Sequence, residues 1–198
     1  MHSALLVTII CVAEVLTMVG TFTFPALLPT FIHEWELNNT EAGWIAGIFL
    51  GGDAVSVPAL VSLTDRIDAR VVHIAGSAVS ALSLFAFAFL ADGFWSALML
   101  RMLAGIGLAA TYMPGLRMLV DRFEGVKRNR GVAFYTASFS LGTAVSFFIS
   151  GEVGEAVGWE TATIVAAVCA VLAILLVALT LRSVTPQEPE EQTALLDF

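Results

Sequence analysis

The sequence is poor in charged residues and in cysteine. Charged side chains make up only 13% of its 198 residues, against roughly 25% in a soluble domain, while 58% are hydrophobic. Its two cysteines, Cys11 and Cys169, both fall inside apolar stretches, which argues against a disulfide framework or a metal site. The net charge of -8 is spread over connections and a tail, so nucleic acid is not expected as a partner. These shortages together indicate a membrane protein.

Six apolar stretches make up most of the chain. They cover residues 4–32, 41–64, 71–91, 95–119, 132–150 and 161–181. Each is long enough to cross a hydrocarbon core of about 30 Å as a helix. The first lacks a basic start and is too long for a cleaved signal peptide. The sequence therefore predicts an all-α membrane protein with six transmembrane helices in residues 1–182, followed by an acidic cytoplasmic tail or linker at 183–198.

Basic and acidic residues alternate between successive connections. Eight of the nine Lys and Arg residues belong to one set of connections: Arg66, Arg70, Arg117, Arg122, Lys127, Arg128, Arg130 and Arg182. By the positive-inside rule both termini are cytoplasmic, and the protein is integral to the plasma or inner membrane. The four tryptophans lie at the opposite ends of the stretches, as is typical of interfacial aromatic residues: Trp35, Trp44, Trp95 and Trp159.

Prolines recur at corresponding places in two stretches. Pro25 and Pro29 lie near the end of the first stretch, and Pro114 lies at a similar distance along the fourth. Paired proline-interrupted spans are typical of transporters built from inverted repeats, so the six helices are predicted to form two inverted three-helix repeats. The alternative is that prolines are simply common in membrane helices.

Small residues recur every fourth position in two stretches. They are Gly43, Gly47 and Gly51 in the second stretch and Ser138, Gly142, Ser146 and Ser150 in the fifth. Such faces allow close approach of helix backbones in a membrane. The prediction is helix packing, with sliding against a partner bundle as a functional extension.

Three charged residues lie well inside the apolar stretches: Glu14, Asp53 and Arg101. A charge in the bilayer is costly and is expected to face a cavity or a partner, so these three are candidates for proton or substrate coupling. Helical spacing puts polar or small residues on the faces of Glu14 and Arg101, which predicts the lining of a polar path by Thr17, Thr21, Gly105 and Tyr112. The alternative for Arg101 is a structural ion pair that holds the helices in register.

Two motifs resemble those of the major facilitator superfamily. The segment SLTDRIDAR is similar to the family loop signature G-x-L-A-D-R-x-G-R-R at Leu63, Asp65, Arg66 and Arg70. The segment RMLAGIGLAA is similar to R-x-x-Q-G-x-G-A-A at Arg101, Gly105, Gly107, Ala109 and Ala110. The match is incomplete, because Val61 and Asp68 replace signature glycines and Ala104 replaces the glutamine. The family's antiporter signature, G-x-x-x-G-P-x-x-G-G, is not satisfied either: Thr143 follows Gly142, and the fifth stretch contains no proline.

The resemblance implies the N-terminal half of a secondary transporter that works by alternating access. It implies a small-molecule substrate and protons as partners, a role in proton coupling for Arg101, and a conformational-switch loop formed by Asp65, Arg66 and Arg70. It also implies a second six-helix half, in the same longer chain or in a second copy. A lone half is expected to expose the face that carries Glu14 and Arg101.

Other classes of function explain the sequence less well. An intramembrane enzyme needs a nucleophile with a base within reach, but His2, His33 and His73 lie at the terminus, in a connection and at the start of the third stretch. A channel would need a filter-like segment, which is absent from the sequence. The alternatives that remain are a non-transporting membrane scaffold and a degenerate fragment. No metal or cofactor is expected.

Overall fold

The computed structural model describes residues 3–182, and every regular element in that part of the chain is a helix. The predicted tail at 183–198 lies outside the described residues. The helices are α1 (Ser3–Met18), α2 (Thr23–Ala26), α3 (Leu28–Glu34), α4 (Asn39–Thr64), α5 (Ala69–Leu90), α6 (Phe94–Val120), α7 (Gly125–Val157) and α8 (Trp159–Thr180). In this part of the chain five helices, α4 to α8, are long and apolar enough to cross a membrane, and α1 is a shorter apolar helix.

The sequence predicts a single helix for the first apolar stretch, and this prediction is wrong. The chain leaves helical geometry after Met18 and continues as the short helices α2 and α3. Ser146 of α7 satisfies the backbone at this break: its hydroxyl donates to the carbonyl of Val19 (2.6 Å) and accepts from the amide of Phe22 (3.0 Å). Backbone groups freed inside a membrane must find partners within the protein. The break is therefore maintained by a residue more than a hundred positions away.

The end of the fifth stretch also differs from the prediction. The fifth stretch, expected to end at Ser150, continues as α7 to Val157, so Glu152 and Glu155 lie on helix and not in a connection. Gly158 then ends α7 with a positive φ of 97°, a conformation that favours glycine. In α6 the helix runs without a break through Pro114.

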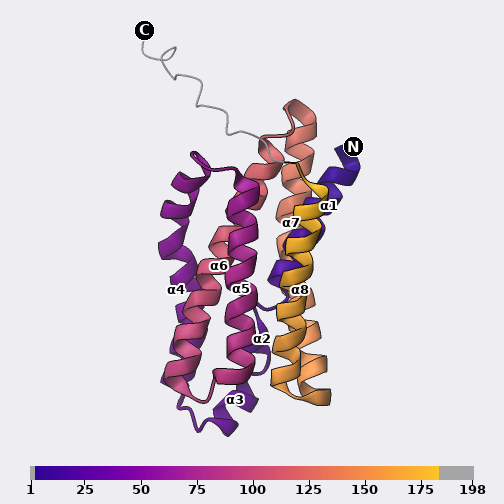
Figure 1. Cartoon of the computed structure of the whole chain (residues 1–198). Coiled ribbons are helices and arrows are strands. Elements are labelled where there is room, and N and C mark those ends of the chain that lie inside the picture. The colour runs from indigo at the N-terminus through magenta and orange to yellow at the C-terminus, as the bar shows by residue number, and fades with distance from the viewer. Residues whose placement is uncertain (1–2, 183–198) are drawn as a thin grey trace.

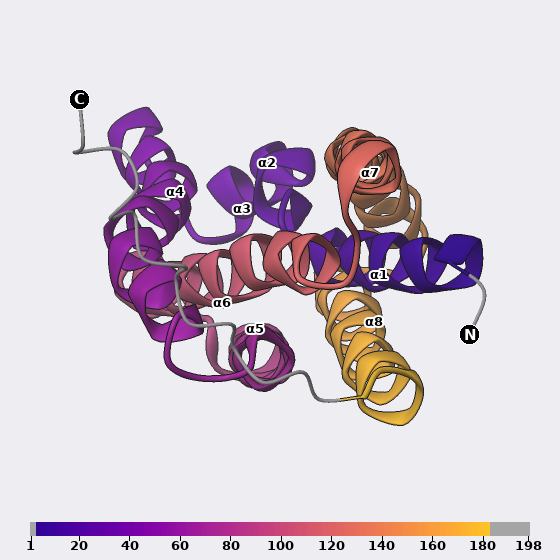
Figure 2. The ribbon, with the colours of Figure 1, turned by 90° about the horizontal axis from the view of Figure 1, so that it is seen from above.

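The helices pack as two groups of three. In one group α6 lies against α4 and α5, in the other α1 lies against α7 and α8, and α5 and α8 join the groups. Figure 2 shows α6 and α1 along the middle of the molecule, flanked by their partners. Figure 1 shows the start of α1, the end of α8 and the α4–α5 and α6–α7 connections at one end, so the basic connections gather there.

The two small-residue faces have different surroundings. On α7, Ser146 bonds the break and a Cβ on Gly142 would lie 2.9 Å from Met18, so this face packs against the first segment. On α4, a Cβ on Gly43 or Gly47 would meet nothing within 4 Å. The prediction of helix packing is confirmed for α7 only, and the α4 face points away from the bundle.

Candidate functional site

Arg101 lies inside the bundle, on α6, with only 4% of its surface exposed. Its guanidinium donates hydrogen bonds to the carbonyls of Gly20 (3.4 Å) and Thr21 (3.0 Å), which belong to the broken stretch after α1. Its Cζ lies 4.2 Å from the ring centroid of Phe49 on α4. Carbonyls at a helix C-terminus carry partial negative charge and lack intrahelical donors. Arg101 therefore caps the break and receives a cation–π contact from the other side.

The structural alternative for Arg101, an ion pair, is wrong in its choice of partner. Within residues 3–182 Arg101 makes no ion pair with a carboxylate; backbone carbonyls take that place. The expectation that a lone half exposes the face carrying Glu14 and Arg101 is also wrong, because Glu14 is fully buried and Arg101 nearly so. The break supplies polar backbone groups inside the bundle, and sequence spacing alone does not reveal such groups.

Glu14 lies on α1 and is 0% exposed. Its Oε2 is 2.8 Å from the hydroxyl of Tyr135, which projects from α7. Its Oε1 is buried and has no hydrogen-bond partner among the described residues. Burial with an oxygen left unpartnered is unfavourable for an ionised carboxylate, so this environment accommodates the neutral acid better.

Tyr135 is the functional candidate that sequence reasoning missed. It is fully buried, its hydroxyl also lies 2.9 Å from the carbonyl of Tyr112, and the two rings stack with centroids 5.5 Å apart. A Cβ on Gly115 of α6 would collide with the Tyr135 hydroxyl, so the glycine makes room for it. The chain has only these two tyrosines, both in apolar stretches, and that scarcity was the available signal.

The residues predicted to line one polar path lie at two separate places. Thr17 and Thr21 are buried, and the Thr17 hydroxyl donates to the carbonyl of Glu14 (2.9 Å). Gly105 lies where α6 crosses α4, against the backbone of Phe49. Asp53 is half-buried on α4 near that crossing. Tyr112 is partly buried beside Tyr135, so the structure brings Tyr112 and Thr17 to Glu14 and leaves Gly105 and Asp53 at the α4–α6 crossing.

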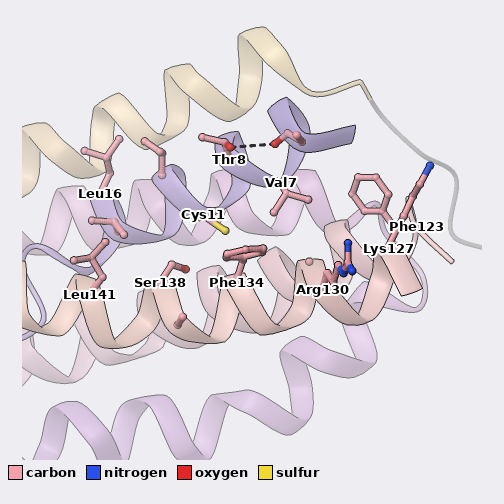
Figure 3. Close-up of a pocket in the computed structure, with 15 residues that line it drawn as sticks. Val7, Thr8, Cys11, Leu16, Phe123, Lys127, Arg130, Phe134, Ser138 and Leu141 are labelled. Atoms are coloured by element: carbon pink, nitrogen blue, oxygen red, sulfur yellow. Dashed lines mark hydrogen bonds between the residues drawn. The ribbon is translucent and has the colours of Figure 1, made fainter. Parts of the chain in front are cut away.

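A groove of about 1000 Å³ runs between α1 and α7 (Figure 3). Its walls are mainly apolar, with Lys127 and Arg130 at one end and Leu16 and Leu141 at the other. Two polar residues in its middle are next to the Glu14 site: Cys11 precedes Glu14 by one helical turn, and the hydroxyl of Ser138 donates to the carbonyl of Tyr135 (2.6 Å). The groove thus passes within one layer of side chains of the buried acid. None of the four residues predicted to line the path lines this groove.

Comparison with known proteins decides the family. A sequence model of the Major Facilitator Superfamily matches residues 10–196. The chain belongs to the major facilitator superfamily. It is 25% identical over 158 residues to protein spinster homolog 1 of Bos taurus and of Homo sapiens, which covers 79% of this chain and 30% of each relative. It is 24% identical over 145 residues to niacin transporter NiaP of Acinetobacter baylyi, which covers 73% of this chain and 33% of that relative. The chain spans about a third of the length of these curated relatives.

The loop motif of the superfamily lies at the basic end of the bundle. Asp65 accepts from Arg117 of α6 at 3.1 Å, and Arg117 also bonds Asp121 at 2.8 Å. Arg70 donates to the carbonyl of Ala178 near the end of α8 (2.6 Å), whereas Arg66 is exposed. The motif thus ties the α4–α5 connection to α6 and α8.

A second arginine supports the end of α8 at the same place. Arg122 donates to the carbonyl of Arg182 at 2.6 Å. Burial lowers the pKa of Arg122, and the nearby carboxylates of Asp68 and Asp121 act in the opposite direction.

His73 is a second residue that the sequence analysis undervalued. It is 1% exposed on α5, and its Nδ1 lies 3.0 Å from the carbonyl of Thr111 on α6, while its Nε2 has no hydrogen-bond partner among the described residues. The sequence placed it at the start of the third stretch, and in the structure the packing of α6 against α5 buries it there. The Ser77 hydroxyl, one turn along α5, donates to its backbone carbonyl (2.9 Å).

Proposed function

We propose that this superfamily member is one helix bundle of a secondary transporter that moves a small molecule across the cytoplasmic membrane by alternating access. On this proposal α1, α2 and α3 together make the first of six crossings, and both termini are cytoplasmic. The gathering of the basic connections at one end of the bundle supports this orientation. The length of the relatives supports a second bundle as the missing partner.

The packing of the helices supports two inverted three-helix repeats. If α1–α3, α4 and α5 form one repeat and α6, α7 and α8 the other, then α1 corresponds to α6, α4 to α7 and α5 to α8. The packing of α6 on α4 and α5 then mirrors the packing of α1 on α7 and α8, and the α5–α8 contact maps onto itself. Transporters of this type place the broken helix of each repeat near the substrate site, which here is α1 with its break.

Glu14 is the proposed proton site, and the observation that carries the proposal is its environment. It is fully buried, has one side-chain partner and lies one layer of side chains from the α1–α7 groove. Thr17 and Thr21 follow Glu14 on the same segment, and Tyr112 of α6 lies beside Tyr135, the partner of Glu14. Arg101 acts at the break six residues further along, where it holds the chain through backbone carbonyls. Asp53 is proposed as a second acid, beside the α4–α6 crossing.

The proposed cycle moves the two bundles relative to each other around a substrate in the central cavity. One wall of that cavity is the α1–α7 groove, whose walls are apolar and whose cytoplasmic end is basic. The Asp65–Arg117 pair and the Arg70 contact with α8 keep the loop motif in place on the cytoplasmic side while the bundles rock.

The test is transport by the full-length chain in proteoliposomes with an imposed proton gradient. Niacin is one probe, because a relative is named as a niacin transporter, and a panel of small amphiphiles is the other. We expect gradient-driven uptake that Glu14→Gln abolishes, while Glu152→Gln, an exposed acid on α7, leaves it intact. Uptake that does not depend on the proton gradient would contradict proton coupling. Binding without transport for every probe would favour a non-transporting scaffold.

A further inference from the structure

The hydroxyl of Tyr135 has more acceptors than protons. It lies 2.8 Å from Glu14 Oε2 and 2.9 Å from the carbonyl oxygen of Tyr112. A tyrosine hydroxyl has a single proton to donate, so it cannot donate to both oxygens at once. If Glu14 were ionised, one of these two short O···O contacts would have no proton between its atoms.

A proton on Glu14 resolves the conflict. The protonated acid donates from Oε2 to the Tyr135 oxygen, and the Tyr135 hydroxyl then donates to the Tyr112 carbonyl. Both contacts become hydrogen bonds, and the unpartnered Oε1 is then a neutral carbonyl oxygen and not half of a buried anion. The geometry therefore corresponds to the protonated state of Glu14.

We propose that Tyr135 is a positioning residue that ties α1 to α6 only while Glu14 carries a proton. When Glu14 releases its proton toward the α1–α7 groove, the products are one carboxylate and one proton in water. The Tyr135 hydroxyl then donates to the carboxylate, and its hydrogen bond to the Tyr112 carbonyl is lost. This inference rests on the proposed function in taking Glu14 as the proton site, and it adds the device that converts protonation into a change at α6.

The tie meets α6 at a weak point of that helix. The Tyr112 carbonyl lies two residues before Pro114, which has no amide proton and is the residue type at which helices bend. Gly115 follows directly, and its missing side chain is what lets the Tyr135 hydroxyl approach the α6 backbone. Loss of the tie therefore frees α6 at the one turn where it bends most easily.

The surroundings of Glu14 contain few other titratable groups. The titratable side chains beside it are Cys11 on α1, Tyr112 on α6 and Tyr135 on α7, and none of them is a cation. Helix α8 also packs against α1, and it contributes the apolar residues Ala173 and Val177 to the hydrophobic core on that side. Among the described neighbours, Tyr135 is thus the group whose hydrogen bond has to change when Glu14 titrates.

The first experiment is hydrogen exchange of the full-length chain in lipid nanodiscs across a range of pH, corrected for intrinsic exchange. In the wild type we expect amides 115–120 to exchange roughly five- to tenfold faster once Glu14 is deprotonated, the ratio that follows from losing one hydrogen-bonded tie. Glu14→Gln, whose amide can donate to Tyr135 as the acid does, should stay protected at every pH. Tyr135→Phe should exchange fast at every pH.

Two further variants keep the test decisive. Tyr112→Phe is the matched control, because it removes the other tyrosine hydroxyl and keeps the backbone carbonyl, so its exchange should follow the wild type. Gly115→Ala pushes the Tyr135 hydroxyl away without removing it and should resemble Tyr135→Phe, which serves if that variant does not fold. Exchange in Glu14→Gln that depends on pH as in the wild type would overturn the proposal, as would Tyr135→Phe behaving like Tyr112→Phe.

Infrared spectroscopy separates this proposal from the proposed transport. The carbonyl band of protonated Glu14, identified by its loss in Glu14→Gln, should shift to higher frequency in Tyr135→Phe because the O–H of the acid no longer donates a hydrogen bond to Tyr135. Gradient-driven uptake with no pH-dependent exchange in α6 would refute the tie and leave proton coupling standing. A pH-dependent tie in a chain that shows no proton-driven uptake would refute the coupling and leave the tie standing.

Discussion

Two buried ionisable residues, Arg101 and Glu14, contact or belong to the same first segment but are held in opposite ways. Arg101 has two backbone carbonyls and an aromatic ring as partners, and these partners cannot change protonation state. Among the described residues, Glu14 has one tyrosine as partner, which can serve as acceptor or donor, and its other oxygen has none. The contacts of Arg101 are therefore independent of pH, whereas those of Glu14 depend on its protonation state.

This contrast explains how a chain can keep charges in a membrane for two different purposes. A guanidinium that neutralises the open end of a broken helix contributes mainly to structure. An acid with incomplete hydrogen bonding has two accessible states, and each protonation state asks for a different arrangement of its neighbours. The predictions below test whether stability follows the first site and pH dependence the second.

The largest effect on stability should come from Arg101→Met. The substitution keeps the length and apolar stem but leaves the carbonyls of Gly20 and Thr21 without donors, at a cost of about 2–5 kcal/mol in the free energy of unfolding. Unfolding in mixed micelles measures it. Arg101→Lys, which keeps the charge but not the planar fork, should lose less, and a loss below about 1 kcal/mol in Arg101→Met would contradict the capping role.

Ser146→Ala should have the next largest effect, because it removes both hydrogen bonds that satisfy the break after α1. We expect a loss of about 1–3 kcal/mol by the same measurement. Ser140→Ala is the matched control, since Ser140 lies on the exposed face of the same helix, and it should change stability by less than about 0.5 kcal/mol. Equal effects from the two serines would mean that the break does not depend on α7.

Glu14→Gln should sharpen the contrast by separating stability from function. A glutamine amide can donate to Tyr135 as the protonated acid does, so stability at low pH should change by less than about 1 kcal/mol. Proton-driven uptake by the full-length chain should nevertheless be lost. A variant that is as destabilised as Arg101→Met would show that the two sites are held alike, against the comparison drawn here.

The smallest effect is expected from Asp65→Asn at the basic end. Its pair with Arg117 is between partly exposed side chains, 52% and 32% accessible, and pairs of this kind contribute about 0–1 kcal/mol. High salt should weaken the pair, so the difference between variant and wild type should shrink as ionic strength rises. A loss that persists in high salt would indicate that Asp65 does more than pair with Arg117.

Much of the architecture followed from periodicity and charge. Apolar runs of sufficient length predicted the long helices, because a bilayer admits few alternatives to a helix. The motif around Asp65 and the motif around Arg101 predicted the superfamily. The first stretch was the exception: its composition is as apolar as that of its neighbours, and the break depends on a hydroxyl from α7, which no local pattern contains.

The candidate site was predicted in its charges and missed in its partners. Glu14 and Arg101 stand out in the sequence because charge is rare in apolar runs, and both occupy the interior of the bundle. Tyr135 carries only a weak signal, the scarcity of tyrosine in the chain, and the backbone carbonyls that bind Arg101 carry none. A charged residue can be recognised from the sequence alone, whereas its hydrogen-bond partner depends on which helices pack against it.

By itself, then, the order of residues determined that this chain is helical, embedded in lipid and basic at one end, with Glu14 and Arg101 inside apolar stretches. Only the tertiary structure decided that, among the described residues, Arg101 bonds the backbone of the broken segment while Glu14 bonds a tyrosine. The reason is that burial of a charge demands a partner but does not specify which one. That choice is made when helices far apart in the chain pack together.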